Sequence, residues 1–386
     1  MIPLMRSTFF NEQETKVELC KFITNAGRLS MGDTTVAFEE EFSKYQNRSY
    51  SVFFNSGSSA NLALIQSLLN VGVLKKGDEV GFSAVTWATN LMPLLQLGLT
   101  PIPIDVSLST LNCMSDDLDK VLHEHYLKCF FLTDLLGFCG DIDKINNICR
   151  ENNIVLIEDA CESLGSIYHG RRLGNYGVAS TFSFFVGHHL STIEGGMVCT
   201  NDKRLYDTLQ MVRAHGWTRN VSMDKQDSLR EEYHIDEFHD MYTFYSMGYN
   251  LRPTEIQSFL GLHQLGLLHD MNRKRQENFK LFSKHSSLNP DFYNLDVGHM
   301  DFVSNFAYPI ICKDKKRFEQ YKKRFQKCCE IRPIVGGSML EQPFFQEGKN
   351  FSCPNAKIIH DEGFYFPNNP DLTEEEKNMI VEMLQR

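Results

Sequence analysis

Paired cysteine spacings, long apolar runs and a leader-like start are all missing from this sequence, and each absence removes a class of protein. The 11 cysteines are scattered, odd in number and include no Cys-x-x-Cys pair, so neither a disulfide framework nor a zinc site is indicated. No stretch approaches the roughly 20 apolar residues of a membrane span. No charged region followed by an apolar run opens the chain, so we expect no signal peptide and a cytoplasmic location.

An excess of positive charge is also lacking. The formal net charge of -10 over 386 residues argues against nucleic-acid binding, which requires a basic face. The one basic run, residues 313–327, carries Phe318, Tyr321 and Phe325 at helical spacing. This run therefore predicts an amphipathic helix with solvated charges rather than a binding patch.

Strand-like apolar runs alternate with helical patterns from about residue 50 to residue 215. The runs are residues 51–54, 79–83, 101–105, 129–133, 154–158 and 180–183. Helical patterns open near residue 58 and cover residues 90–97 and 141–152. This alternation predicts an α/β domain in which helices cover both faces of a mostly parallel sheet.

The pattern changes after residue 250. A long helical stretch over residues 254–286 precedes isolated strands near 305–309 and 330–332. The chain closes on a helix that opens with the capping box of Thr373 and Glu376. We therefore predict a large domain over residues 1–250 and a smaller α+β domain over residues 251–386.

Three segments at the ends of predicted strands suit the three parts of a pyridoxal-type cofactor. Residues 55–61, rich in Ser and Gly, lead into a helix whose first N–H groups and hydroxyls would bind a phosphate. A carboxylate at Asp159 would keep a pyridine nitrogen protonated, and Trp87 would lie against the ring. Singly these features indicate a turn, a helix cap and a core residue, but their order favours one cofactor site.

Four further segments carry a resemblance to a known family. They are residues 183–196 with the pair His188-His189, residues 213–220 (Arg-Ala-His-Gly-Trp-Thr-Arg-Asn), residues 248–253 and residues 331–335. From about residue 30 to its end, the chain resembles the aspartate-aminotransferase-like, fold-type I coenzyme B6 enzymes that act on nucleotide-linked sugars. The resemblance implies a three-layer sheet domain with a smaller C-terminal domain, and a homodimer with L-glutamate as amino donor.

The resemblance also implies roles for single residues. The cofactor phosphate would be held by Gly57, Ser58 and Ser183, with Asn250 reaching in from a partner subunit. Asp159 would pair with the pyridine nitrogen, Trp87 would stack on the ring and Glu162 would lie beside it. His188 would be the catalytic acid/base, and the substrates would be bound by His215, Arg219 and Arg332. A surface ion pair remains the plain alternative for Arg219 and Arg332.

His188 stands where the aminotransferases of this family have a lysine that bonds covalently to pyridoxal phosphate. Histidine cannot form that stable bond, but its pKa near neutrality still allows proton transfer. The sequence is thus similar to the 3-dehydratases of the family, which would use pyridoxamine phosphate to remove the C3 hydroxyl of a 4-keto-6-deoxy sugar. A GDP-linked mannose configuration is expected from the resemblance alone, and a CDP sugar or a heptose stays open.

Two alternatives remain beside this interpretation: a sugar-nucleotide aminotransferase with an unusual base, and a cofactor-binding relative that has lost activity. A related dehydratase class adds an iron–sulfur cluster, which requires several closely placed cysteines. This chain has none between Cys199 and Cys312, and Cys161 alone cannot hold a cluster. We therefore expect no iron–sulfur cluster.

The variant His188→Lys tests the alignment of residues 183–196. We expect the lysine to trap pyridoxal phosphate covalently, giving a yellow, borohydride-sensitive protein, and dehydration to fall sharply. Absorbance spectra before and after borohydride measure the trapping. A lysine variant that binds pyridoxal phosphate but stays colourless would show that position 188 does not face the cofactor.

Overall fold

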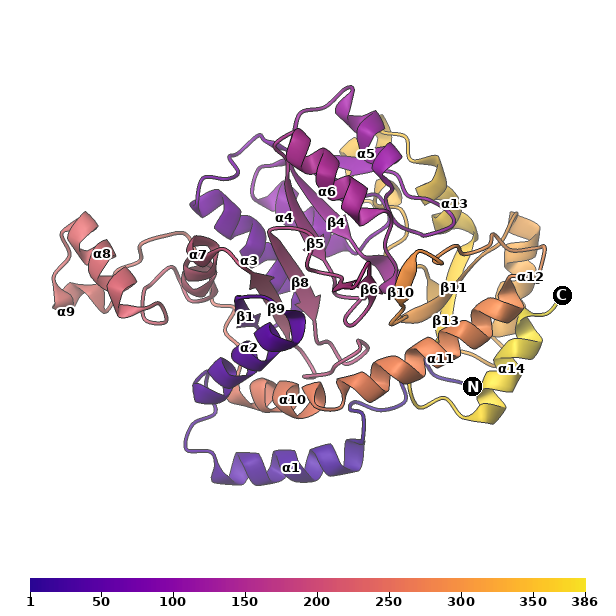
Figure 1. Cartoon of the computed structure of the whole chain (residues 1–386), viewed down its shortest axis with the longest axis horizontal. Coiled ribbons are helices and arrows are strands. Elements are labelled where there is room, and N and C mark those ends of the chain that lie inside the picture. Colours follow the sequence, from indigo (N-terminus) through magenta and orange to yellow (C-terminus); the bar gives the residue numbers. More distant parts are fainter.

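The computed structural model describes all 386 residues and is built around a seven-stranded sheet (Figure 1). The strand order is β1-β9-β8-β5-β4-β2-β3, and every neighbouring pair is parallel except the two made by β9. The strands are β1 (Tyr50–Phe54), β2 (Glu79–Ser83), β3 (Thr100–Ile104), β4 (Leu127–Thr133), β5 (Val155–Asp159), β8 (Ala179–Ser183) and β9 (Gly196–Thr200). The predicted α/β architecture and its mostly parallel sheet are confirmed.

Helices cover both faces of this sheet. The helices of the first 250 residues are α1 (Glu12–Asn25), α2 (Asp33–Gln46), α3 (Gly57–Asn70), α4 (Ala88–Gln96), α5 (Ser115–Leu122), α6 (Ile142–Glu151), α7 (Lys203–Arg213), α8 (Met223–Tyr233) and α9 (Glu237–Asp240), of which α1, α8 and α9 lie away from the sheet. Alternation along the strands makes the two-sided core. In β4, Phe131 packs with the side chains of α3 and α4, whereas Phe130 packs in the cluster that contains α5 and α6.

The C-terminal part adds a second, small sheet and its own helices. They are β10 (Met300–Phe302), β11 (Ala307–Ile311), β12 (Arg332–Pro333) and β13 (Gly363–Pro367), with α10 (Glu255–Leu265), α11 (Leu268–Ser286), α12 (Lys315–Phe325), α13 (Pro354–Glu362) and α14 (Glu374–Leu384). The sheet order is β11-β13-β12, and β10 instead pairs with the short hairpin of β6 (Ile167–Tyr168) and β7 (Arg171–Arg172). Short 3₁₀ turns lie at η1 (Leu135–Gly137), η2 (Met339–Glu341) and η3 (Gln346–Asn350).

The helices of the C-terminal part agree with the sequence analysis in two details and differ from it in one. The basic run forms α12 with Tyr321 and Phe325 buried, and the capping box at Thr373 is present. The single long helix over residues 254–286 was wrong, because the chain breaks into α10 and α11 at Gly266 and Leu267. The break lets α10 pack against α2 while α11 runs on to α14.

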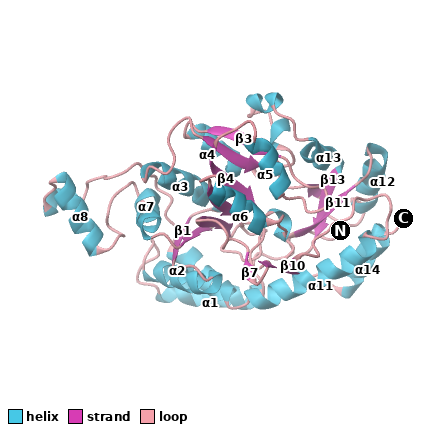
Figure 2. Cartoon of the chain, turned by 45° about the horizontal axis from the view of Figure 1, so that its top comes forward, coloured by secondary structure: helices cyan, strands magenta, loops and turns pink.

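The boundary at residue 250 stays a prediction. Contacts cross it in both directions, since α10 lies on α2 and Ile2 pairs in parallel with Cys329. Both chain ends lie on the same side of the molecule (Figures 1 and 2). None of the helices combines the length and the apolarity needed to cross a membrane.

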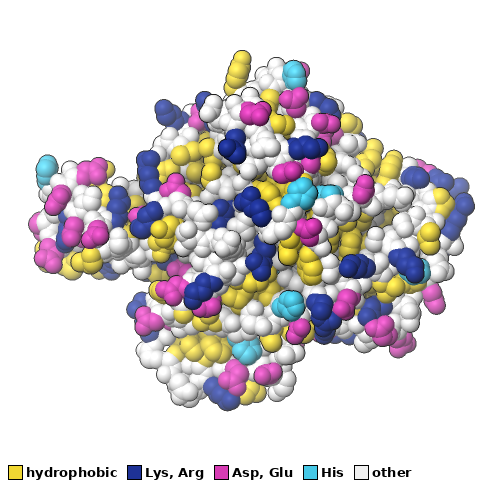
Figure 3. All heavy atoms as spheres, in the orientation of Figure 1, with side chains coloured by type: hydrophobic (Ala, Val, Ile, Leu, Met, Phe, Trp, Pro, Cys, Tyr) yellow, Lys and Arg dark blue, Asp and Glu magenta, His cyan; other side chains and the backbone are white.

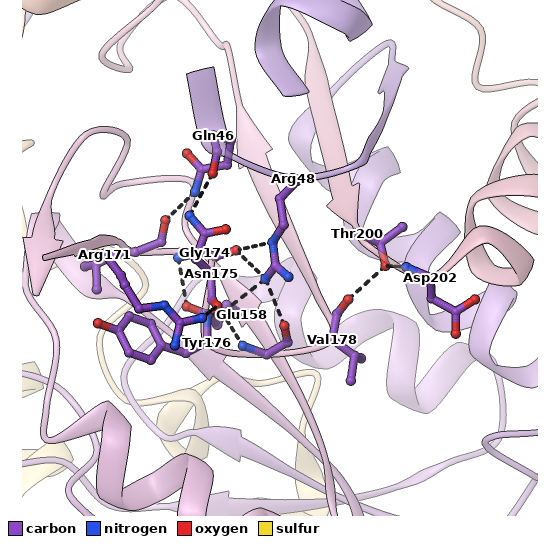
Figure 4. Close-up of polar contacts among 12 residues, drawn as sticks. Gln46, Arg48, Glu158, Arg171, Gly174, Asn175, Tyr176, Val178, Thr200 and Asp202 are labelled. Carbon is purple, nitrogen blue, oxygen red and sulfur yellow. Dashed lines mark hydrogen bonds and ion pairs between the residues drawn. The ribbon is translucent and has the colours of Figure 1, made fainter. Parts of the chain in front are cut away.

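A buried acid fixes the loop that leads into β8 (Figure 4). Glu158 on β5 accepts hydrogen bonds from the backbone N–H groups of Gly174 (2.8 Å), Tyr176 (2.6 Å) and Gly177 (2.5 Å). The Arg48 Nη2 atom lies 4.0 Å from the Glu158 carboxylate and donates to the carbonyl oxygens of Gly174 and Gly177. These contacts set the position of β8 beside β5, and Ser183 stands at the end of β8.

A second buried acid, Asp134, has no hydrogen-bond partner for either carboxyl oxygen. Burial, followed by the nearby charges of Glu158 and Asp159, raises its pKa well above the usual range. The unfolded chain ionises this group above about pH 4, whereas the folded chain keeps it protonated. Folding stability is therefore lost as the pH rises from that value toward the raised pKa of the folded state.

We expect Asp134→Asn to remove this loss. The difference in melting temperature between this variant and the wild type should grow in favour of the variant as the pH rises from 5 to 8. The reason is that the amide, unlike the carboxyl group, loses no proton when the chain unfolds. Thermal unfolding at several pH values measures the difference. Asp119→Asn, at an exposed position on α5, is the matched control and should leave the pH dependence unchanged. A constant offset between Asp134→Asn and wild type would contradict the expectation.

Candidate active site

A cavity of about 450 Å³ opens at the carboxyl ends of the parallel strands, where ligands collect in open α/β sheets. Its far wall comes from the C-terminal part of the chain, through Phe306, Arg332 and Tyr365. Eight of the predicted site residues line it together: Gly57, Ser58, Trp87, Asp159, Glu162, Ser183, His188 and Arg332. No group of three or more His, Cys, Asp or Glu side chains is placed to hold a metal ion.

The start of α3 and the end of β8 form one side of this cavity. Ser56 caps α3 by accepting a hydrogen bond from the Ser59 N–H at 3.0 Å. Gly57 packs so tightly that a Cβ atom there would lie 2.6 Å from the Ser183 Cβ. The first N–H groups of α3 and the hydroxyls of Ser58 and Ser183 thus meet at a helix N-terminus, which suits a phosphate.

Asp159 is buried at the floor of the cavity and makes three hydrogen bonds. Its Oδ2 accepts from the side-chain amides of Asn61 at 3.0 Å and Asn90 at 2.8 Å, and its Oδ1 accepts from the Cys161 N–H at 2.9 Å. The donors come from α3, α4 and the turn after β5. The carboxylate is therefore held in one orientation toward the cavity, as a partner for a protonated ring nitrogen must be.

Trp87 stands at the cavity mouth just before α4. Its side chain is 55% exposed although it lines the cavity, so a face of the indole is available to stack on a flat ligand. A core role for this tryptophan is thereby excluded.

His188 lies in the loop that joins β8 to β9, with its ring centroid 5.1 Å from that of Phe306. Its Nδ1 is 2.7 Å from the Cys161 carbonyl oxygen. Because a carbonyl oxygen only accepts, Nδ1 carries the proton and Nε2 keeps a free lone pair. Burial lowers the pKa of His188, which favours this neutral form, ready to accept a proton.

Glu162 and Tyr365 give the cavity two further titratable groups. One Glu162 oxygen accepts from the Leu136 N–H at 3.0 Å, and burial, with the charge of Asp159 adding to it, raises the pKa of this acid to about 8. Burial likewise raises the pKa of Tyr365 to about 12, with the Glu162 charge contributing. Arg332 is exposed at the rim, where its Nη2 lies 2.7 Å from Glu330.

Three predicted residues do not line the cavity of their own chain: Asn250, His215 and Arg219. They belong to the stretch that carries α8 and α9, which projects from the body of the molecule (Figures 1 and 2). Ala214 pairs with Asn250, and the Arg219 guanidinium lies 4.1 Å over the ring of Trp217. This arm, residues 215–250, projects at α8 and α9, whereas its two ends are joined to each other and to α7 by the hydrogen bonds of His215 N–H to the Tyr249 carbonyl and of Tyr249 N–H to the Val212 carbonyl.

Comparison with known proteins decides the family. Residues 11–385 match the model of the DegT/DnrJ/EryC1/StrS aminotransferase family. The chain belongs to this family. Two similar family members share the name GDP-4-keto-6-deoxy-D-mannose 3-dehydratase. The Yersinia pseudotuberculosis protein is 34% identical over 98% of this chain and 97% of its own length. The Escherichia coli O55:H7 protein is 30% identical over 99% of both chains.

Solved structures of similar proteins have the same fold as this chain. A crystal structure of GDP-4-keto-6-deoxymannose-3-dehydratase with a trapped PLP-glutamate geminal diamine has a TM-score of 0.88 and 29% identity, and covers 100% of both chains. A histidine-to-asparagine variant of that enzyme with bound GDP-perosamine also has a TM-score of 0.88, at 28% identity. The predicted fold type I architecture is thereby confirmed.

Four side chains of the site were missed in the sequence analysis. Asn61 and Asn90 donate hydrogen bonds to Asp159. Both are asparagines in the first turns of a helix that follows a strand, and this position could have marked them in the sequence as candidate site residues. Phe306 and Tyr365 come from β11 and β13 or their approaches, far along the chain, and no local pattern marks them as lining residues.

The tight contact at Gly57 leads to a testable expectation. Gly57→Ala should push the start of α3 away from Ser183 and weaken binding of pyridoxal phosphate by about 5- to 150-fold, since overpacking costs about 1–3 kcal/mol. Titration of the cofactor by absorbance measures the affinity. Gly27→Ala is the control, because a Cβ at Gly27 meets nothing within 4 Å. Equal affinities for the two variants would show that this contact does not shape the site.

Proposed function

We propose that this protein removes the C3 hydroxyl of a nucleotide-linked 4-keto-6-deoxy sugar, giving a 4-keto-3,6-dideoxy sugar. GDP-4-keto-6-deoxy-D-mannose is the proposed substrate, on the strength of the two similar dehydratases. The single observation that carries the proposal is His188, a histidine with a free Nε2 at the wall of the cavity, in a segment that has no lysine. An aminotransferase would need that lysine, so the alternative activity is disfavoured.

The cavity fits a pyridoxal-type cofactor. Gly57, Ser58 and Ser183 would hold the phosphate at the start of α3, Asp159 would pair with the ring nitrogen, and Trp87 would cover a ring face. Glu162 would lie beside the ring. When bound, pyridoxamine phosphate supplies an amine for the sugar ketone and a ring that accepts electrons.

His188 would serve both proton transfers. Its Nε2 takes a proton at the start of the elimination, and the imidazolium then delivers that proton to the departing C3 oxygen. The Cys161 carbonyl accepts from Nδ1–H throughout, so the ring stays oriented and the developing positive charge is stabilised. Phe306, tilted 47° against the imidazole, excludes water from one side of it.

Arg332 would bind the carboxylate of L-glutamate, the proposed donor that restores the amine form of the cofactor. Its guanidinium is at the cavity rim, and its ion-pair partner, Glu330, is exposed enough to be exchanged for a ligand carboxylate.

We further propose a cytoplasmic homodimer in which the projecting arm serves the neighbouring cavity. Large apolar side chains are exposed on the arm, among them Phe238 (72%), Tyr242 (71%) and Met247 (72%). Figure 3 shows hydrophobic side chains reaching the surface there. A symmetric pair would cover this surface and bring Asn250, His215 and Arg219 to a partner's site, where His215 and Arg219 would contact the sugar or its diphosphate.

Product analysis tests the proposed reaction. The protein, supplied with pyridoxal phosphate and glutamate, would be incubated with 4-keto-6-deoxy sugars linked to GDP, CDP, UDP and dTDP. We expect a deoxygenated sugar and free ammonia, fastest with the GDP-linked mannose derivative, measured by mass spectrometry and an ammonia assay. An amino sugar without ammonia release would instead establish an aminotransferase.

The variant His188→Asn isolates the proposed acid/base. The fold and cofactor affinity should persist, while dehydration should fall by about 10²–10⁴-fold or more, since one group performs both proton transfers. His269→Asn, at an exposed position on α11, is the matched control and should keep wild-type turnover. Near-normal dehydration by His188→Asn would assign the base elsewhere.

A further inference from the structure

The second histidine of the pair, His189, faces away from the active-site cavity. It is only 2% exposed, and instead of the large cavity it lines a smaller one of about 50 Å³ behind His188. Its Nε2 lies 2.8 Å from the Ser304 carbonyl oxygen and must be the donor, so its Nδ1 keeps the lone pair. That Nδ1 atom is buried and has no protein partner.

Arg275 of α11 lines the same small cavity and is 5% exposed. Its Nη1 donates to the carbonyl oxygens of Phe306 (2.8 Å), Asn305 (3.5 Å) and Asn368. His189 and Arg275 together therefore hold three consecutive carbonyl groups, those of residues 304–306. The same segment carries Phe306, whose ring contacts His188 and lines the active-site cavity.

We propose that His189 is a positioning residue, not a second base: by holding residues 304–306 it seats Phe306 against His188. This inference rests on the proposed dehydration. A backbone segment held at three successive carbonyl groups cannot shift without breaking buried hydrogen bonds, each costing about 1–3 kcal/mol when left unmade. Phe306 is therefore kept at the distance that orients the imidazole of His188.

Two unpartnered atoms, one on His189 and one on Arg275, lead us to expect a buried water between these side chains. The Arg275 Nε–H is a donor without a protein partner, and the His189 Nδ1 is an acceptor without one. Water is the ligand that satisfies both, and the cavity of about 50 Å³ is large enough for it. A small anion could accept a hydrogen bond from Arg275, but it has no proton to donate to His189 Nδ1, and the lone pair of that atom would repel it.

Charge also opposes a role for His189 as a base. Burial lowers the pKa of His189 well below its usual range. The positive charge of Arg275 lowers this pKa further, and so does the nearby imidazole of His188. The other charged groups around this small cavity are Arg6 and Asp371, and Arg6 is engaged by Glu376 and by the Asp371 carbonyl. His189 stays neutral in these surroundings.

Two variants separate positioning from proton transfer. His189→Gln keeps a donor that reaches the Ser304 carbonyl and should recover most of the wild-type kcat, with an unshifted pH profile. His189→Leu removes the donor, so kcat should fall by about 10–100-fold while KM for the sugar nucleotide changes little. A glutamine variant as impaired as the leucine variant, with one limb of the pH profile missing, would overturn the proposal. Wild-type turnover by His189→Leu would overturn it equally.

Two measurements on the wild-type holoenzyme need neither turnover nor a folded variant. In ¹⁵N-histidine NMR, His189 should show one neutral form with Nε2 protonated and no titration between pH 6 and 9; titration in this range would overturn the proposal. A high-resolution crystal structure should show a water within hydrogen-bond distance of Arg275 Nε and His189 Nδ1, and a dry cavity would refute the water link. Both results stand even if the wild type proves not to dehydrate sugars.

Discussion

The arrangement of the cavity depends on the buried carboxylate of Asp159. Its three hydrogen-bond donors tie the starts of α3 and α4 to the end of β5. One carboxylate therefore positions α3, which begins at Gly57, and α4, which begins after Trp87. Without the carboxylate, two buried amides would lose their acceptor, at a cost of about 1–3 kcal/mol each. The group proposed to orient a cofactor ring thus also holds together the elements that surround it.

The direction of β9 explains how His188 reaches that wall. In a parallel continuation, the chain would leave β8 through a crossover helix and re-enter the sheet at its opposite edge. Here Ser183 is paired with Gly196 of the antiparallel β9, so the intervening loop stays at the carboxyl edge beside Asp159. Within this loop, His189 is hydrogen-bonded to the Ser304 carbonyl, and Arg275 holds the carbonyls of the next two residues, Asn305 and Phe306.

Much of this arrangement was predictable, because strand ends in a parallel sheet meet at one edge. The apolar runs located β1, β2, β4, β5 and β8 to within about two residues, and the residues after them do converge on one cavity. The helix break at Gly266 was not predicted, and that residue keeps helical dihedral angles, so the break involves no unusual backbone conformation at this glycine. Phe306 and Tyr365 arrive through long-range pairing, which has no local signature. His215, Arg219 and Asn250 lie outside the cavity of their own chain, and the proposed dimer is what would bring them to a site.

The tight packing between Gly57 and Ser183 and between Gly196 and the Ser56 carbonyl limits which positions around the cavity tolerate substitution. The sheet side of the cavity has no room for a side chain at either glycine, so a substitution there would displace the neighbouring backbone or Ser183. On the opposite wall, Phe306 and Tyr365 are packed, but Arg332 is exposed at the rim, where no such steric limit applies. A change in the shape of this cavity is therefore accommodated more easily at the Arg332 rim than beside Gly57 or Gly196.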